Sequence, residues 1–114
     1  MGKPVTVLLI DDDPAVCRAL SRLLRFSGFQ VLVASSGPNA LALVAEFGSE
    51  INIVLSDVQM PGLDGHQIAA RLSARYPVLL MSGALEQQLS GVLSKPFTPD
   101  ELLNHINSAL CLAA

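Results

Sequence analysis

The sequence is poor in charged and in aromatic side chains. Charged residues make up 15% of its 114 residues and aromatic residues 4%, whereas hydrophobic residues make up 51%. The large hydrophobic fraction excludes an intrinsically disordered chain, and the scarcity of aromatics predicts an aliphatic interior. A chain of this length leaves no room for two independent cores. We therefore expect residues 1–114 to form a single domain.

Basic residues are few. Seven lysines and arginines stand against ten acidic residues, which gives a net charge of -3. This balance argues against a nucleic-acid surface, because binding a phosphate backbone requires clustered cations. The nearest approach to such a cluster is formed by Arg18, Arg22 and Arg25, which recur at helical spacing. We interpret these three arginines as a solvent-exposed helix face.

Cysteine and long apolar runs are also scarce. Cys17 and Cys111 lie far apart in apolar helical patterns, without the spacing of metal ligands. Free thiols of this kind are typical of cytoplasmic proteins. The first apolar run, from Val5 to Ile10, is too short for a membrane span or a signal peptide. We expect a cytoplasmic protein that makes no contact with a membrane.

Short apolar runs alternate with helical patterns along the chain. The predicted helices run from Pro14 to Gly28, from after Pro38 to Gly48, from just after Gly65, and from Thr98 or Pro99 onward. Strands that alternate with helices imply right-handed βαβ units. The sequence therefore predicts an α/β fold, a doubly wound five-stranded parallel sheet with helices on both faces. The predicted strands are Val5–Ile10, Phe29–Ala34, Ile51–Leu55, Pro77–Met81 and Val92–Leu93.

Polar residues interrupt the apolar pattern where the predicted strands end. Asp11 and Asp12 follow the first strand, Asp57 the third, Ser82 the fourth and Lys95 the fifth. The carboxyl ends of parallel strands lie along one edge of the sheet, and ligands bind at that edge. Each of these residues alone has an ordinary structural explanation, as a helix cap or a loop residue. Their joint placement predicts a functional site.

The residue types at this edge suit phosphoryl transfer. Three crowded carboxylates repel one another, and a divalent cation relieves the repulsion. Oxygen ligands without cysteine or histidine favour Mg²⁺ over zinc. Asp57, alone on its strand end, is placed as a nucleophile that accepts a phosphoryl group as an acyl phosphate. Lys95 and Ser82 supply a cation and a hydroxyl for the phosphoryl oxygens.

With these residues in place, the sequence resembles the CheY-like receiver domains of two-component response regulators. The resemblance covers nearly the whole chain, from Val5 to about Leu110, and its four motifs occur in the order of the family. They are Leu9-Ile10-Asp11-Asp12-Asp13-Pro14, Ser56-Asp57-Val58-Gln59-Met60-Pro61-Gly62-Leu63-Asp64-Gly65, Met81-Ser82-Gly83 and Ser94-Lys95-Pro96-Phe97.

The resemblance implies a flavodoxin-like sheet of strand order 2-1-3-4-5. It implies that Asp57 receives phosphate from the phosphohistidine of a sensor histidine kinase or a phosphotransfer protein. Asp12 would bind Mg²⁺ directly, whereas Asp11 would bind it through a water molecule. The other ligands would be Asp57 and the backbone carbonyl of Gln59. Ser82 would be the switch hydroxyl and Lys95 the partner of the phosphate.

The resemblance also sets expectations for activity and partners. Such a domain is not an enzyme for other substrates, since it catalyses only its own phosphorylation and dephosphorylation. Its further partners would be an output domain or a downstream protein, and a second copy of the chain in a homodimer.

Two features depart from the family. Only twelve residues separate Ser82 from Lys95, and a parallel crossover with its helix needs about ten to twelve in all. We therefore predict a shortened or irregular fourth helix within residues 83–91. Val92 stands where the family usually has the aromatic residue of its switch. We expect the phosphorylation chemistry to be intact and the output surface to be altered.

Two other functions remain open on the sequence. A haloacid-dehalogenase-type phosphatase also has acidic residues after its first strand, and Asp11, Ser82 and Lys95 would serve in it, but it leaves Asp57 unexplained. A receiver-like binding module with weakened switching is the other. A charged cluster without a function would carry an uncompensated electrostatic cost, which favours a working receiver.

Overall fold

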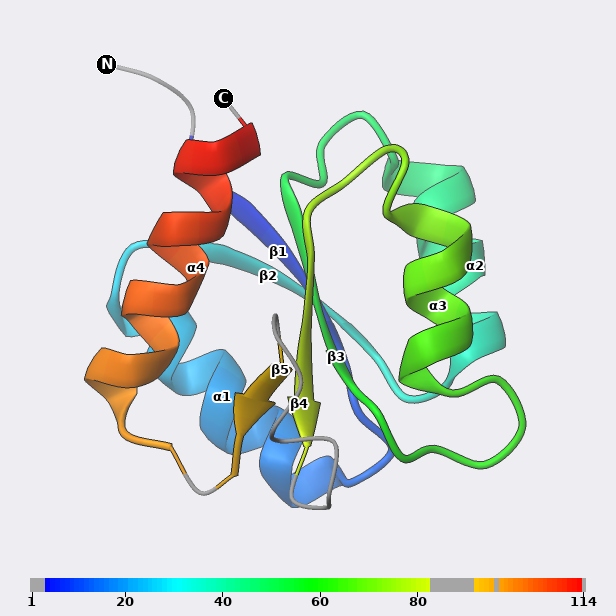
Figure 1. Ribbon diagram of the computed structural model, residues 1–114, viewed down its shortest axis with the longest axis horizontal. Helices are drawn as coiled ribbons and strands as arrows, with labels where there is room; N and C mark the ends of the chain where they lie inside the picture. Colours follow the sequence, from blue (N-terminus) through cyan, green and yellow to red (C-terminus); the bar gives the residue numbers. More distant parts are fainter. Residues whose placement is uncertain (1–3, 83–91, 96, 114) are drawn as a thin grey trace.

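The computed structural model describes residues 4–82, 92–95 and 97–113. In this part of the chain, strands and helices alternate from β1 to β4, and α4 follows β5 (Figure 1). The strands are β1 (Thr6–Ile10), β2 (Gln30–Ala34), β3 (Ile53–Asp57), β4 (Val78–Ser82) and β5 (Val92–Ser94). The helices are α1 (Pro14–Phe26), α2 (Gly37–Phe47), α3 (Gly65–Leu72) and α4 (Pro99–Ala113).

The strands form one sheet in the order β2-β1-β3-β4-β5, and every neighbouring pair is parallel. Helices α1 and α4 cover one face, and α2 and α3 cover the other (Figure 1). The predicted α/β fold with a parallel sheet between helices is confirmed. The carboxyl ends of β1, β3 and β4 therefore lie along one edge.

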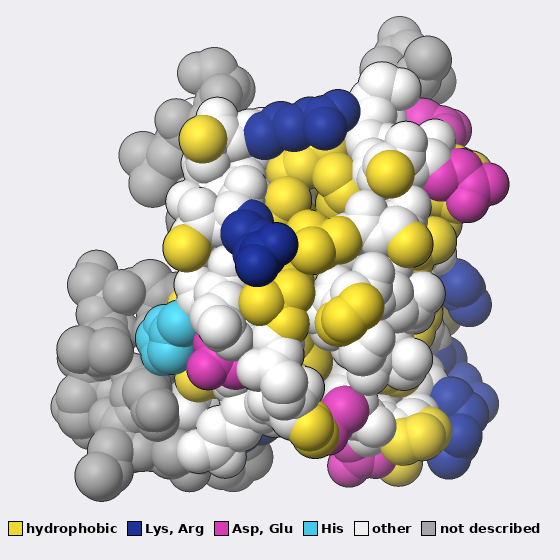
Figure 2. All heavy atoms as spheres, turned by 90° about the vertical axis from the view of Figure 1, so that its right-hand side faces the viewer, with side chains coloured by type: hydrophobic (Ala, Val, Ile, Leu, Met, Phe, Trp, Pro, Cys, Tyr) yellow, Lys and Arg dark blue, Asp and Glu magenta, His cyan; other side chains and the backbone are white. Residues whose placement is uncertain are grey.

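The alternation of side chains along β1 divides the core in two. Val7 and Leu9 pack with the α1 and α4 side chains, whereas Leu8 and Ile10 pack with those of α2 and α3. All five residues of β1 are buried, as expected for a parallel strand with helices on both faces. On the α2 and α3 face, hydrophobic side chains gather along the line between the two helices (Figure 2).

Acidic side chains cap the starts of two helices. The Asp13 side chain accepts a hydrogen bond from the Ala15 N–H at 2.9 Å, and Pro14 is the first helical residue of α1. At α3, Asp64 and Gln67 form a reciprocal capping box. Gly28, which follows the end of α1, has a φ of 98°, a conformation that glycine adopts without strain.

The ends of β3, β4 and β5 differ from the sequence prediction, and β5 runs on from Leu93 to Ser94. β3 was predicted over Ile51–Leu55 but spans Ile53–Asp57, and β4 runs on to Ser82. A polar side chain at the end of an apolar run predicts the end of the strand, yet the backbone pairs further, with Asp57 opposite Met81 and Ser82 opposite Ser94. Asp57 and Ser82 are thus held within the sheet rather than in loops.

The shortened fourth helix predicted within residues 83–91 lies outside the described residues, as does the side chain of Val92. No helix among the described residues is long and apolar enough to cross a membrane.

Candidate functional site

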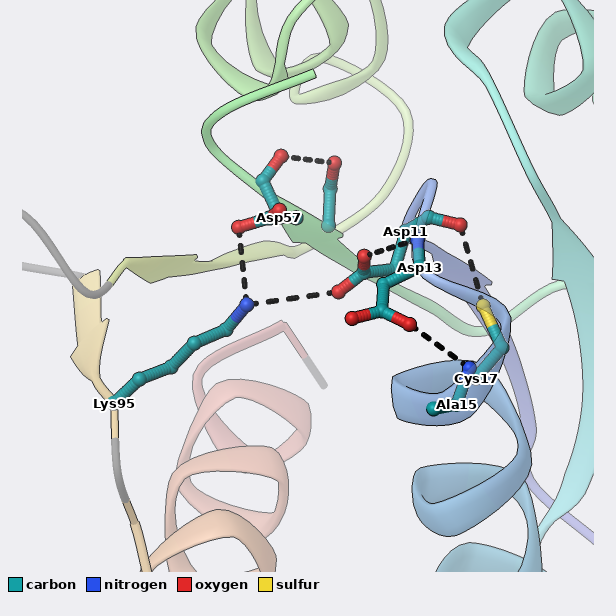
Figure 3. Close-up of polar contacts among 7 residues, drawn as sticks. Asp11, Asp13, Ala15, Cys17, Asp57 and Lys95 are labelled. Carbon is teal, nitrogen blue, oxygen red and sulfur yellow. Dashed lines mark hydrogen bonds and ion pairs between the residues drawn. The ribbon is translucent and has the colours of Figure 1, made fainter.

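Three elements bring charged side chains together at the carboxyl edge of the sheet (Figure 3). Asp11 directly follows β1, Asp57 is the last residue of β3, and Lys95 directly follows β5. Asp11 is 1% exposed and Asp57 is 9% exposed, whereas Asp12 faces solvent. The site is therefore a set of buried carboxylates with one exposed carboxylate at its mouth.

Lys95 joins the two buried carboxylates. Its Nζ lies 3.2 Å from Asp57 Oδ1, within hydrogen-bond distance, and 3.6 Å from Asp11 Oδ2. The Lys95 N–H donates to the Ser82 carbonyl at 2.8 Å, which fixes the start of the lysine side chain beside the end of β4. A single ammonium thus faces two carboxylates (Figure 3).

The carboxylates are close enough to share one cation. One oxygen each from Asp11, Asp12 and Asp57 lies within 4.8 Å of the others. Asp11 Oδ1 accepts a hydrogen bond from the Asp13 N–H at 2.9 Å, but Asp11 Oδ2 is buried without a hydrogen-bond partner among the described residues. A buried carboxylate oxygen that accepts no hydrogen bond, and that meets the Lys95 ammonium only at the longer distance of 3.6 Å, lies here beside two further carboxylates. This set fits a hard divalent cation with oxygen ligands.

Burial raises the pKa of Asp11 above its ordinary value, and the charges of Asp57 and Asp12 act in the same direction. The Asp13 N–H and the Lys95 ammonium oppose this rise. The charged form of Asp11 is therefore disfavoured at the site. A bound cation would relieve this cost, which supports the same interpretation of the cluster.

A buried thiol holds the backbone beside Asp11. Cys17 Sγ donates to the Asp11 carbonyl oxygen at 3.2 Å, and burial raises the pKa of the Cys17 thiol, so that it stays a protonated donor. From the sequence, Cys17 is only a free thiol in an apolar helical pattern. The available signal is its position six residues after Asp11, in the first turn or so of α1.

Close packing at the start of α3 fixes the end of β3. A side chain at Gly65 would collide with the backbone of Asp57 and Val58, so glycine is required there. The Gly65 N–H donates to the Val58 carbonyl, and the Val58 N–H donates to Met81, each at 3.0 Å. These contacts hold the backbone that carries Asp57.

The structure thus brings together Asp11, Asp12, Asp57 and Lys95, as the sequence predicted. Ser82 is buried at the end of β4, which pairs with β5 just before Lys95. Gln59 lies two residues after Asp57 in the loop that leads to α3, with its side chain exposed. The edge thus carries the buried Asp57 carboxylate, the Lys95 ammonium and the Ser82 hydroxyl. The carboxylates of Asp11 and Asp12 add further oxygen atoms that can bind a metal ion.

Comparison with known proteins agrees with this arrangement. The family model for the response regulator receiver domain matches residues 7–107. The chain therefore belongs to the response regulator receiver domain family, the receivers of two-component systems. Receiver domains are not, in general, enzymes that turn over a separate substrate.

Curated relatives support the same family. The response regulator protein FleR of Pseudomonas aeruginosa is 37% identical, over 86% of this chain and 23% of FleR. The response regulator MprA of Mycobacterium sp. strain KMS is 34% identical, over 94% of this chain and 51% of MprA. The chain thus spans about half or less of the length of these relatives.

Solved structures are similar over nearly the whole chain. The receiver domain of the hybrid histidine kinase CckA superposes with a TM-score of 0.79 at 33% identity, covering 92% of this chain and 98% of that one. A putative response regulator from Chloroflexus aurantiacus gives a TM-score of 0.84 at 31% identity, covering 96% and 99%. The CheY-like fold is therefore shared with these proteins.

Proposed function

We propose that this receiver accepts a phosphoryl group on Asp57 from a phosphohistidine of a sensor histidine kinase or a phosphotransfer protein. The observation that carries the proposal is the placement of Lys95, whose Nζ contacts both Asp57 and Asp11 within a cluster of three carboxylates. The Lys95 ammonium, held between carboxylates at the sheet edge, provides the positive charge that stabilises an incoming phosphoryl group.

In the proposed reaction, a carboxylate oxygen of Asp57 attacks phosphorus, and the phosphorus–nitrogen bond of the donor breaks. The donor imidazole keeps the electron pair of that bond, and the product is an acyl phosphate on Asp57. Lys95 then pairs with a phosphoryl oxygen, and the Ser82 hydroxyl donates to another. In this proposal the chain catalyses only its own phosphorylation and the later hydrolysis of the acyl phosphate.

The proposed cofactor is Mg²⁺, held by Asp11, Asp12, Asp57 and the backbone carbonyl of Gln59. Bound there, it would neutralise charge on the phosphoryl oxygens. Three clustered carboxylates, one of which has a buried oxygen that accepts no hydrogen bond, support this choice. Asp11 is held in place by the hydrogen bonds that the Asp13 N–H and the Cys17 thiol donate to it.

We further propose that residues 1–114 act as a single receiver domain in the cytoplasm, where the free thiols of Cys17 and Cys111 persist. The proposed partners are a histidine kinase or phosphotransfer protein, an output domain or downstream protein, and a second copy of the chain. The sensor kinase CckA of Brucella abortus, 34% identical over 12% of its length, supports the link to kinases.

Asp11 makes stability depend on pH when no metal is bound. Because the folded-state pKa of Asp11 is raised, the folded protein keeps this proton to a higher pH than the unfolded chain. The contribution of Asp11 is full below about pH 4 and is lost as the pH rises through the folded-state pKa. Urea denaturation in EDTA should therefore show that Asp11→Asn gains stability over the wild type with rising pH.

Adding Mg²⁺ should make the wild type more stable than Asp11→Asn. At about 100 times its Kd, Mg²⁺ is expected to stabilise the wild type by about 2.7 kcal/mol and Asp11→Asn by clearly less. Equal stabilisation of the two proteins would contradict the assignment of Asp11 to the metal site.

The proposed function is tested with acetyl phosphate as a donor. With Mg²⁺, the protein is expected to gain about 80 Da, the mass of one phosphoryl group, in a form that hydroxylamine removes. With EDTA in place of Mg²⁺, the gain should be absent. No phosphoprotein under either condition would rule out the proposed transfer.

Two further measurements separate the receiver from the two other functions. Turnover of a small phosphoester that survives Asp57→Asn but not Asp11→Asn would indicate the dehalogenase-type phosphatase, against which the receiver family match already weighs. Weakened switching stays a prediction. Phosphorylation that leaves backbone amide shifts unchanged beyond Asp57 and Ser82 would support it.

A further inference from the structure

An open groove of about 700 Å³ lies between α1 and the edge strand β2. Arg18, Arg22 and Arg25 line it along one side of α1. Its remaining lining consists of Cys17 and Ser21, which are buried, and of Phe26 and Val33, which are exposed. The three arginines that the sequence suggested as a solvated helix face thus surround a hollow on the surface.

The groove concentrates positive charge on an acidic protein. It holds three of the seven basic residues of a chain whose net charge is -3, and no acidic residue lines it. Among the described residues, the only ion pairs are those of Lys95. Arg25 Nη2 reaches the Val31 carbonyl at 3.4 Å, and neither Arg18 nor Arg22 pairs with a described acid. The guanidinium groups of these arginines are therefore available to pair with the carboxylates of a partner.

The groove also carries exposed apolar surface. Phe26 is 92% exposed and Val33 is 39% exposed, and these are the large hydrophobic side chains that stand out in solvent within the described part of the chain. Both line the groove beside the arginines. Aromatic and arginine side chains are enriched together at protein interfaces and among the residues that dominate binding energy.

We propose that this groove binds an acidic segment of a partner protein. The carboxylates of the segment would pair with the arginines, and an apolar side chain of the segment would pack against Phe26 and Val33. Arg18 and Arg25 are seven residues apart, about 10 Å along the helix axis. One carboxylate or phosphate group does not span that length. Alternate side chains of an extended peptide lie about 7 Å apart on one side, so two or three acidic residues reach all three arginines.

The groove opens away from the phosphoryl site, although Cys17, which donates to the Asp11 carbonyl, lies in its lining. The side of α1 next to Lys95 and Phe97 carries Val16, Ala19 and Leu20, and none of these residues lines the groove. A segment bound in the groove would leave Asp57 accessible. The proposed surface therefore adds a second binding site and does not depend on the proposed phosphorylation.

The test measures the fluorescence anisotropy of a labelled peptide of about ten alternating glutamate and leucine residues. We expect the wild type to bind it at low salt, and binding to weaken as salt is added. The double variant Arg22→Gln, Arg25→Gln should bind at least about tenfold more weakly. Phe26→Ser should weaken binding while its salt dependence stays the same.

Two controls complete the test. Arg71→Gln, which removes an exposed arginine on α3, should leave the affinity unchanged, and a peptide with glutamine for glutamate should not bind. The variants should also accept phosphate from acetyl phosphate as the wild type does. Loss of phosphorylation in them would overturn the separation of the two sites.

Three outcomes would overturn the proposed partner. One is a wild type that does not bind the peptide, and another is equal affinity in the double variant and in Arg71→Gln. The third outcome is tighter binding of a short DNA duplex than of the peptide, which would identify nucleic acid as the ligand of the groove.

Discussion

Asp57→Asn is expected to reduce phosphorylation by acetyl phosphate to background, a fall of at least about a thousandfold. Asparagine keeps the size of the side chain and an oxygen for the Lys95 hydrogen bond, but its amide is not a nucleophile at phosphorus. Asp57 is 9% exposed and is the last residue of β3, at the carboxyl edge of the sheet. Intact-protein mass spectrometry after incubation with Mg²⁺ measures the loss.

A matched variant shows whether the loss is specific. Asp100→Asn removes an exposed carboxylate in the first turn of α4 and should be phosphorylated at the wild-type rate. Urea denaturation should show that both variants are folded. A folded Asp57→Asn protein that still gains one phosphoryl group at the wild-type rate would contradict the role given to Asp57.

Lys95→Gln should slow phosphorylation by about a hundred- to a thousandfold, the usual cost of removing one group that stabilises developing charge. In the structure the Lys95 ammonium lies 3.2 Å from Asp57 Oδ1, and glutamine has neither its charge nor its reach. The rate of acetyl phosphate transfer at saturating Mg²⁺ measures the effect.

Lys95→Arg provides the comparison for charge. Because it keeps the charge in a different geometry, it should fall between the wild type and Lys95→Gln. The Kd for Mg²⁺ should not weaken in Lys95→Gln, since the carboxylates Asp11, Asp12 and Asp57 remain. A wild-type transfer rate in Lys95→Gln would show that the ammonium only pairs with the resting carboxylates.

The sheet and the main site residues could be predicted because their signals are local. Buried strands such as β1 are continuous apolar runs, and the end of each run marks the sheet edge where Asp11, Asp57 and Lys95 meet. The strand ends were less well predicted, because Ser56 and Asp57 pair through their backbones within β3. Polarity of a side chain does not show where backbone pairing stops.

Other features depend on contacts that no local pattern reports. The Cys17 thiol donates to the Asp11 carbonyl, but an isolated cysteine in a helical pattern carries no sign of that bond. The arginines of α1 were interpreted as a solvated face, and the groove between them requires β2 to place Val33 beside the helix. Such surfaces arise from the packing of two elements that are separate in sequence.

The role of Asp57 is tested most directly by locating the phosphoryl group in the phosphorylated wild-type protein. Reduction of the phosphorylated protein with borohydride converts an aspartyl phosphate to a distinct residue that peptide mass spectrometry places in the sequence. We expect a single modified position, Asp57, formed only with Mg²⁺. Modification at Asp11 or Asp12 instead would contradict it and would point to the phosphatase chemistry.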